Sequence, residues 1–296
     1  MSGWLLEPLR EPVVLRSLIE LALIGLVAGT LGCWIVLAGR SYSAESLAHS
    51  MLPGLVGAAL LGLPLVLGGA VGLAVGASLI ALVGRIKVLD GEVAVSVVIT
   101  SLFGAGVLLG LAPATPAGLN GLLFGDLLAV GLGEIAIAAA YAAVVLVVLF
   151  ALHEGLLVAG FDRLNARALG RAPAPFDLVL ALLLAGATLV AVQALGNLLV
   201  VAMLVGPAAT ARLLSKRIGP MMLIGVAVAW AASLAGLYAS YHADLAAGAS
   251  VTCALVIAFA AALLARTLRE TIAANGNRRK GRGGQSRGLR LRSRRA

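Results

Sequence analysis

The sequence is poor in charged residues, which occupy 12% of its 296 positions, whereas hydrophobic residues occupy 61%. A soluble domain could not hide so much apolar surface from water, so that class of protein is excluded. Cysteine is scarce as well: only Cys33 and Cys253 are present, both within apolar runs, and no disulfide framework is indicated. Residues 1–16 lack the basic start and small-residue cleavage site of a signal peptide, so we expect the first apolar run to be retained.

Motifs of catalysis are also missing. The sequence has no Gly-x-x-x-x-Gly-Lys-[Ser/Thr] phosphate loop, so any ATP hydrolysis must take place on another chain. His153-Glu154 resembles the start of a zinc-protease His-Glu-x-x-His helix, but position 157 is Leu and the second metal ligand is absent. We therefore predict that the chain is not an enzyme and holds no permanent cofactor.

Long apolar runs with few charges are typical of transmembrane helices. They predict an all-α, polytopic integral membrane protein with about nine transmembrane helices. Residues 18–265 would form the membrane domain, between an N-terminal extracytoplasmic segment (1–17) and a basic tail (266–296) for which we expect no regular structure. The predicted spans are Leu18–Ala38, Ser46–Leu63, Leu65–Val83, Val93–Leu111, Leu132–Leu152, Phe176–Ala194, Asn197–Leu214, Met221–Ser240 and Leu245–Ala265.

The basic residues predict the orientation of these spans. If nine helices alternate and the C-terminus is cytoplasmic, all of the 22 Lys and Arg residues except Arg10 and Arg16 lie in inner segments. Cytoplasmic loops of membrane proteins carry this excess of positive charge. The N-terminus is therefore predicted outside and the C-terminus inside. Half of the basic residues lie between Arg266 and Arg295, where we favour a topological anchor over a site that binds anionic lipid or nucleic acid. Membrane lipid is an expected partner of the chain, and nucleic acid is not.

Glycine is abundant, with 37 residues, and it recurs at intervals of four in Gly25/Gly29, Gly68/Gly72/Gly76 and Gly106/Gly110. Small residues at this spacing let membrane helices approach each other closely. The pattern predicts a densely packed helical bundle.

The pair Glu45 and His49 is the main candidate site. The two residues are one helical turn apart, so both project from one face, and carboxylate with imidazole suits Zn²⁺, Mn²⁺ or Fe²⁺. Ionisable groups inside a bilayer are costly and mark functional sites by default. Pro53-Gly54 predicts a helix kink close to the pair. The alternative is that Glu45 pairs with Arg40 and His49 bonds a backbone carbonyl.

Three further segments hold candidate residues. His242 and Asp244 lie in a short outer turn, where they could touch an incoming ion or a docking protein. Phe161–Gly170 is a polar cytoplasmic stretch whose apolar residues recur at helical spacing, as in an amphipathic docking helix. Pro207, in the middle of a span, predicts a second kink.

Three stretches, taken together and in order, resemble the membrane permease subunits of ATP-driven metal importers of the zinc/manganese type. Ser43–Gly54 is similar to the family's Gly-Asp-Ala-Leu-Ser-His-Ala-x-Leu-Pro-Gly stretch. Phe161–Gly170 is similar to its Phe-Asp-x-x-x-Ala-x-x-x-Gly segment, and Gly196–Leu214 to its stretch ending Pro-Ala-Ala-Thr-Ala-Arg-Leu. The likeness covers nearly all of Leu18–Ala265.

The resemblance implies a homodimeric permease in the bacterial inner membrane, with Zn²⁺, Mn²⁺ or iron as the transported substrate. Its partners would be a cytoplasmic ATPase subunit and an extracytoplasmic metal-binding protein. The family's metal-associated aspartate and histidine fall on Glu45 and His49, and Glu in place of Asp lengthens that side chain by one methylene. The ATPase-coupling surface would comprise Phe161, Asp162, Arg163, Leu164, Arg167, Ala168 and Gly170. Two rivals remain open: a permease for a metal chelate or cobalamin, and a proton-coupled carrier that acts alone.

Overall fold

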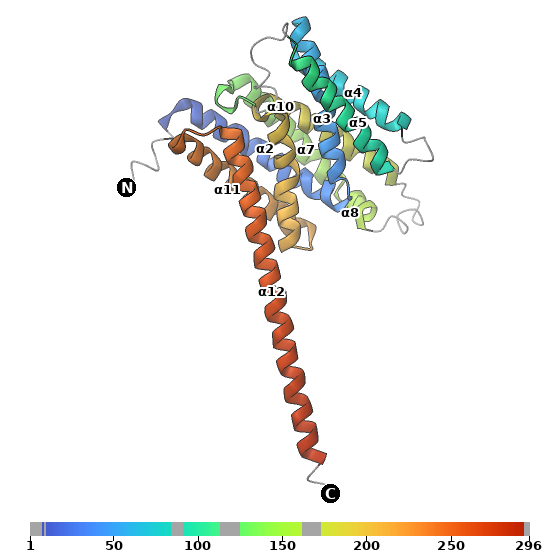
Figure 1. The fold of residues 1–296 in the computed structure, drawn as a ribbon, viewed down its shortest axis with the longest axis vertical. Coiled ribbons are helices and arrows are strands. Elements are labelled where there is room, and N and C mark those ends of the chain that lie inside the picture. Colours follow the sequence, from blue (N-terminus) through green and yellow to red (C-terminus); the bar gives the residue numbers. More distant parts are fainter. Residues whose placement is uncertain (1–7, 9, 84–90, 113–124, 162–172, 293–296) are drawn as a thin grey trace.

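The computed structural model describes residue 8 and residues 10–83, 91–112, 125–161 and 173–292 (Figure 1). Within these residues the chain is helical and contains no strand. The all-α prediction is therefore confirmed. The elements are α2 (Pro12–Leu37), α3 (Ser41–Leu61), α4 (Leu65–Val83), α5 (Gly91–Gly110), the 3₁₀ turn η1 (Leu127–Ala129), α7 (Leu132–Ala151), α8 (His153–Phe161), α10 (Pro173–Leu214), α11 (Ile218–Ala243) and α12 (Ala247–Arg292).

The helices coincide with the predicted apolar runs. Among the residues that the structure describes, five segments could cross a membrane by length and composition: Pro12–Leu37, Leu132–Ala151, Pro175–Val192, Ile218–Ala243 and Ala247–Thr271. Shorter apolar helices occur at Leu65–Ile80, Val95–Gly110 and Leu199–Leu214. The sixth and seventh predicted spans fall in the single element α10. Gly196 interrupts that element with φ 68° and ψ 165°, a conformation essentially restricted to glycine.

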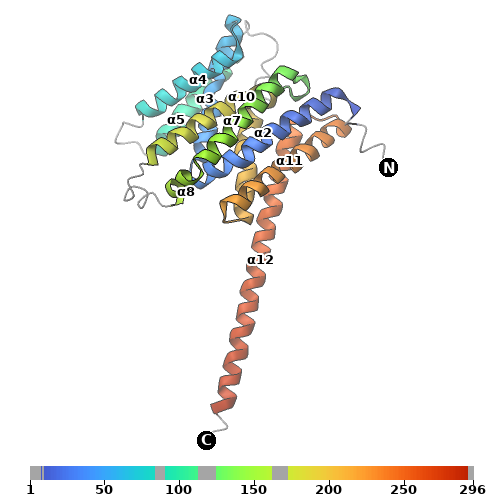
Figure 2. The ribbon, with the colours of Figure 1, turned by 180° about the vertical axis from the view of Figure 1, so that it is seen from behind.

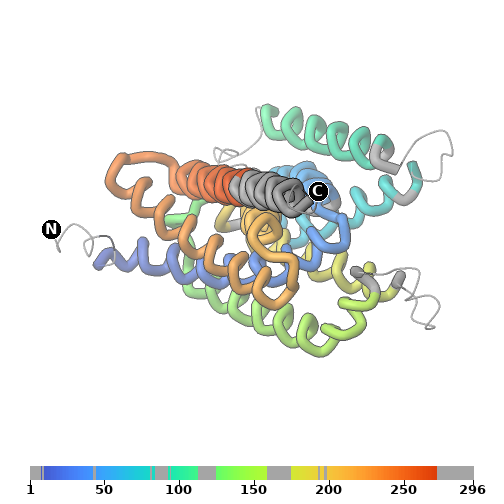
Figure 3. The backbone as a smooth tube through the Cα atoms, turned by 90° about the horizontal axis from the view of Figure 1, so that it is seen from below, coloured from blue at the N-terminus to red at the C-terminus, as the bar shows by residue number. Residues whose placement is uncertain are grey.

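Helix α2 lies at the centre of the bundle. It packs against α7, α10 and α11, and Figures 2 and 3 show it running between α7 and α11. Its side chains are buried along most of its length, including Leu21, Leu31 and Trp34. By contrast, outer helices expose large apolar side chains such as Phe150 and Leu223, as a lipid-facing surface requires.

Helices α3, α4 and α5 form a second group that packs closely through glycine. A Cβ added to Gly54 would come within 2.1 Å of the carbonyl oxygen of Gly68, and one added to Gly72 within 2.9 Å of the Cα of Met51. A Cβ added to Gly106 would approach the backbone nitrogen of Pro53 to 2.9 Å. The predicted close packing is thus confirmed at these interfaces. Helix α3 continues through Pro53-Gly54 without leaving helical conformation.

The two ends of the membrane domain differ from the sequence prediction. Helix α2 already begins at Pro12, because proline suits the first turn of a helix, so part of the predicted segment 1–17 belongs to it. Ser17 in this part is buried and donates to the carbonyl of Leu127, 2.7 Å away. Helix α12 continues to Arg292 and extends away from the bundle, where we expected no regular structure (Figure 1). Extending an existing helix avoids the cost of nucleating a new one.

Candidate functional site

The predicted ligand pair lies near the beginning of α3. A short turn with Gly39 at φ 70° joins α2 to Arg40, the residue that precedes the first turn of α3. Glu45 and His49 follow one turn apart, and Oε1 of Glu45 lies 3.9 Å from Nε2 of His49. The two side chains therefore share a face, as their spacing predicted.

His49 is held by packing rather than by a backbone hydrogen bond. Its side chain is 16% exposed, and its Nδ1 atom is buried without a hydrogen-bond partner in the structure. The ring meets the ring of Phe103 from α5 edge-on, with centroids 4.8 Å apart. The alternative in which His49 satisfies a carbonyl is therefore not what the structure shows, and Nε2, the ring nitrogen nearest to Glu45, is left to bind a ligand.

Glu45 is the exposed member of the pair, with 47% of its side chain accessible. The alternative partner Arg40 is engaged elsewhere: its Nη2 atom lies 2.9 Å from Oδ2 of Asp177 in α10. Tyr42, one turn before Glu45, bonds its hydroxyl to that of Ser96 in α5. The beginning of α3 is thus fixed to two neighbouring helices, and the Glu45 side chain remains partly accessible beside His49.

The separation of the pair suits a shared ion better than a direct hydrogen bond. A distance of 3.9 Å is too long for a hydrogen bond. Two ligands bound to one ion at about 2 Å, with tetrahedral angles, lie roughly 3.3 Å apart, which a small side-chain rotation would achieve. The neighbouring hydroxyls of Ser46 and Ser50 donate to carbonyls of their own helix. Oxygen and nitrogen donors are thus provided by Glu45 and His49.

This pair alone is an incomplete metal site. Among the residues that the structure describes, no three His, Cys, Asp or Glu side chains come together. A bound divalent ion usually has three or four protein ligands in a tight site. Further donors for an ion at Glu45 and His49 would have to come from water, from residues of this chain outside the described ranges, or from another chain.

The remaining candidates lie apart from the pair. His242 and Asp244 are at the end of α11, where Asp244 adopts a left-handed conformation with φ 56° and the His242 ring contacts Tyr241. Pro207 lies inside the second half of α10. Phe161 is the last residue of α8, whereas Asp162, Arg163, Leu164, Arg167, Ala168 and Gly170 fall outside the described residues. The ring of His153 packs edge-on against that of Trp34, with the two centroids 5.5 Å apart, and Glu154 is exposed. Within the described residues, His153 and Glu154 therefore form no metal site.

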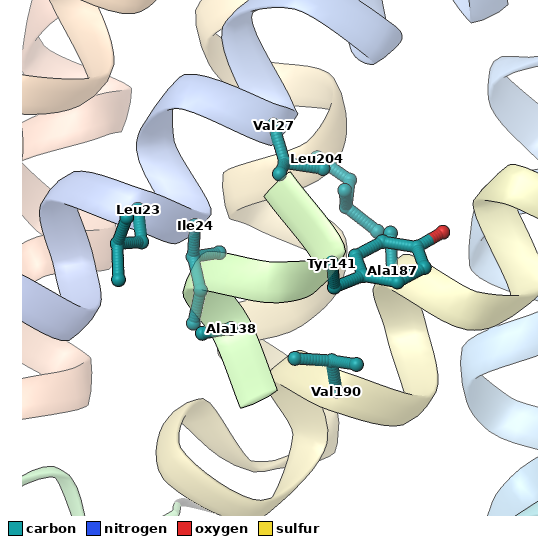
Figure 4. Close-up of a pocket in the computed structure, with 8 residues that line it drawn as sticks. All are labelled: Leu23, Ile24, Val27, Ala138, Tyr141, Ala187, Val190 and Leu204. Carbon is teal, nitrogen blue, oxygen red and sulfur yellow. The ribbon is translucent and has the colours of Figure 1, made fainter. Parts of the chain in front are cut away.

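A pocket between α2, α7 and α10 is apolar and offers no ligand for an ion. Figure 4 shows its lining, in which Tyr141 is the sole residue with a polar side-chain atom. The Tyr141 hydroxyl donates to the carbonyl of Leu183. The remaining lining residues are Leu23, Ile24, Val27, Ala138, Ala187, Val190 and Leu204.

The structure adds two residues that sequence reasoning missed. Phe103 contacts the metal-candidate His49, but an aromatic residue within an apolar span carries no signal of that role. Asp177 pairs with Arg40. This ion pair could have been anticipated from the sequence, because the predicted orientation places Arg40 and Asp177 at the cytoplasmic ends of their helices.

Comparison with known proteins gives a consistent result. The profile of the ABC 3 transport family matches residues 10–266. A probable iron transport system membrane protein of Haemophilus influenzae is 31% identical over 254 residues, covering 85% of this chain and 93% of its own. The manganese import system permease protein ScaB of Streptococcus gordonii is 31% identical, covering 82% and 88%. The solved structure of PsaBC from Streptococcus pneumoniae in complex with Fab contains a similar chain, with a TM-score of 0.81, 28% identity and coverage of 88% and 95%.

Proposed function

The chain belongs to the ABC 3 transport family, and from this premise we propose that it is the permease subunit of an ATP-driven importer of a divalent transition metal. It is a multi-pass protein of the bacterial inner membrane and a transport subunit. The observation that carries the proposal is the Glu45–His49 pair, which presents one carboxylate and one imidazole from the same helix face.

The coordination of the ion is completed by a second copy of the chain. In a homodimer related by a twofold axis, each copy contributes Glu45 and His49, which gives four protein donors. The Glu45 side chain supports this arrangement, because nearly half of it (47%) is accessible in the single chain. A site shared between two copies also opens when the copies move apart, so the ion can be released.

The substrate is a first-row metal that accepts both nitrogen and oxygen donors. Mn²⁺, Fe²⁺ and Zn²⁺ all do so, and selectivity among them depends on geometry and availability. The relatives in Haemophilus influenzae and Streptococcus gordonii are named as iron and manganese transport proteins, which favours these two metals. The absence of cysteine near the pair in the sequence agrees with this choice, since thiolates favour softer metal sites.

The partners follow from the membrane arrangement. With nine spans, the N-terminus outside and the C-terminus inside, α11 ends at the outer face, where His242 and Asp244 meet an extracytoplasmic metal-binding protein. Phe161–Gly170 lies at the inner face and docks into a cytoplasmic ATPase subunit. Pro53, Gly54 and Pro207 lie within the helices beside the path, where a proline weakens the backbone hydrogen bonding of its helix.

The proposal is tested by reconstituting the chain with the ATPase and binding protein that co-purify with it. We expect Mn²⁺ or Fe²⁺, delivered by the binding protein, to stimulate ATP hydrolysis, whereas Mg²⁺ alone gives only the basal rate. Metal transport by the purified chain in the absence of any nucleotide-binding subunit would contradict the proposal and support a secondary carrier.

A further inference from the structure

The helix that carries the ligand pair is joined to α10 by an ion pair. Arg40 directly precedes α3, and Asp177 lies four residues after the start of α10. Their closest atoms are 2.9 Å apart, and the side chains are only 32% and 20% exposed. A charge-assisted contact at this distance, partly shielded from water, is stronger than one between fully exposed side chains.

Asp177 also lies close in the chain to the proposed ATPase-coupling segment. Helix α10 begins at Pro173, three residues after Gly170, the last residue of the proposed ATPase-coupling segment. From Pro173 to the interruption at Gly196, α10 is one continuous helix, so a displacement of its start moves Asp177 with it. A shift of the coupling segment therefore reaches Asp177 first, before it reaches the deeper part of α10.

Helix α3 packs against α10 as well as against α4 and α5, but two side-chain contacts near its beginning lead to α5. Tyr42 bonds to Ser96, and His49 packs on Phe103, both in α5. The Phe103 ring orients His49, and neither contact leads to the start of α10. Of these interactions at the beginning of α3, the Arg40–Asp177 ion pair is the one that joins it to α10.

We propose that the Arg40–Asp177 ion pair couples the state of the ATPase to the position of Glu45 and His49. This inference rests on the proposed function. Arg40 and Asp177 are positioning residues, because neither touches the ion and each acts through the helix that it holds in place. When the coupling segment moves, the pair moves the first turn of α3 and with it the ligands. Such a movement changes how strongly metal binding and ATP hydrolysis depend on each other, while the residues that bind the metal stay the same.

The test is a charge exchange in the reconstituted complex. Arg40→Asp and Asp177→Arg each place like charges together, and the double variant restores an attractive pair in reversed order. We expect each single variant to reduce the metal stimulation of ATP hydrolysis by about five-fold or more, at the low end of typical coupling between sites. Basal hydrolysis and Mn²⁺ binding, measured on the same samples, should stay within about two-fold of the wild type. The double variant should recover most of the stimulation.

Tyr42→Phe is the matched control, because it removes a contact of the same helix turn to α5 and leaves the ion pair intact. It should keep wild-type stimulation. Single charge variants with normal stimulation, or a folded, metal-binding double variant that fails to recover it, would overturn the inference. A wild-type complex that metal does not stimulate would instead overturn the proposed function itself, so the two failures are distinguishable.

Discussion

Phe103 shows how a residue without polar atoms can affect a metal site. Its ring meets His49 edge-on and restricts the orientation of the imidazole. An aromatic contact of this kind contributes about 0.5–1.5 kcal/mol, so we expect Phe103→Leu to weaken Mn²⁺ affinity by roughly two- to ten-fold. Equilibrium binding to the purified complex measures the effect. Phe150→Leu is the control, because Phe150 is 87% exposed and lies away from the pair, in α7. Equal losses in both variants would contradict this role.

Glu20 is a buried carboxyl group that the proposed transport cycle does not use. It is 1% exposed, and its Oε2 atom has no hydrogen-bond partner in the structure. Burial disfavours a charged carboxylate, and Glu20→Gln removes that charge while it keeps the shape, so it should not lower the midpoint of thermal unfolding. Ser17→Ala provides the contrast, because it leaves the buried carbonyl of Leu127 without its donor and should cost about 1–3 kcal/mol. A large loss of stability in Glu20→Gln alone would show that the carboxyl group makes a needed contact.

The sequence could identify the ligand pair but not its surroundings. The spacing of Glu45 and His49 determines that they share a helix face, so their proximity was predictable. The contacts of His49 with Phe103 and of Arg40 with Asp177 join residues far apart in the chain. Such contacts depend on how helices pack, which the spacing within one helix does not specify. Glu20 could have been noticed, since it interrupts an apolar run.

At the scale of elements, glycine determines how closely α3 and α4 approach. Gly54 leaves room for the backbone of α4, whereas a Cβ added to Gly57, in the same helix, would meet nothing within 4 Å. We expect Gly54→Ala to destabilise the protein by more than about 1 kcal/mol, because backbone must move apart. Gly57→Ala should instead be neutral or stabilising by about 0.5–1 kcal/mol, since alanine favours a helix. Thermal unfolding in one detergent compares the two variants, and equal effects would contradict the packing argument.

The limits of the elements were predictable where composition changes sharply. Helix α4 occupies the predicted span Leu65–Val83, bounded by a Gly-Leu-Pro turn before it. The interruption at Gly196 falls between the predicted spans that end at Ala194 and begin at Asn197. Composition was a poorer guide at the ends of the domain. The polar residues before Leu18 concealed the first turns of α2, and the basic tail concealed the continuation of α12.

At the scale of the whole molecule, the account requires that α11 end outside the cell and that α10 end inside. We therefore expect Asp244→Cys, in a background with Cys33 and Cys253 replaced by alanine, to react with a membrane-impermeant thiol reagent added to intact cells. Ser215→Cys, just after α10, should react only after the membrane is opened. Both positions are outside the apolar helices, so reagent access depends on the side of the membrane. The reverse labelling pattern would contradict the orientation and the placement of both partners.

The central claim, that the chain conducts a divalent metal past Glu45 and His49, is tested most directly by metal uptake. Proteoliposomes containing the full complex take up Mn²⁺ in the presence of ATP and the binding protein, and the initial rate is compared between variants. We predict that Glu45→Ala and His49→Ala each reduce uptake to near the level without ATP, whereas His153→Gln, which changes a histidine packed on Trp34, retains it. Wild-type uptake in both Glu45→Ala and His49→Ala would contradict the account.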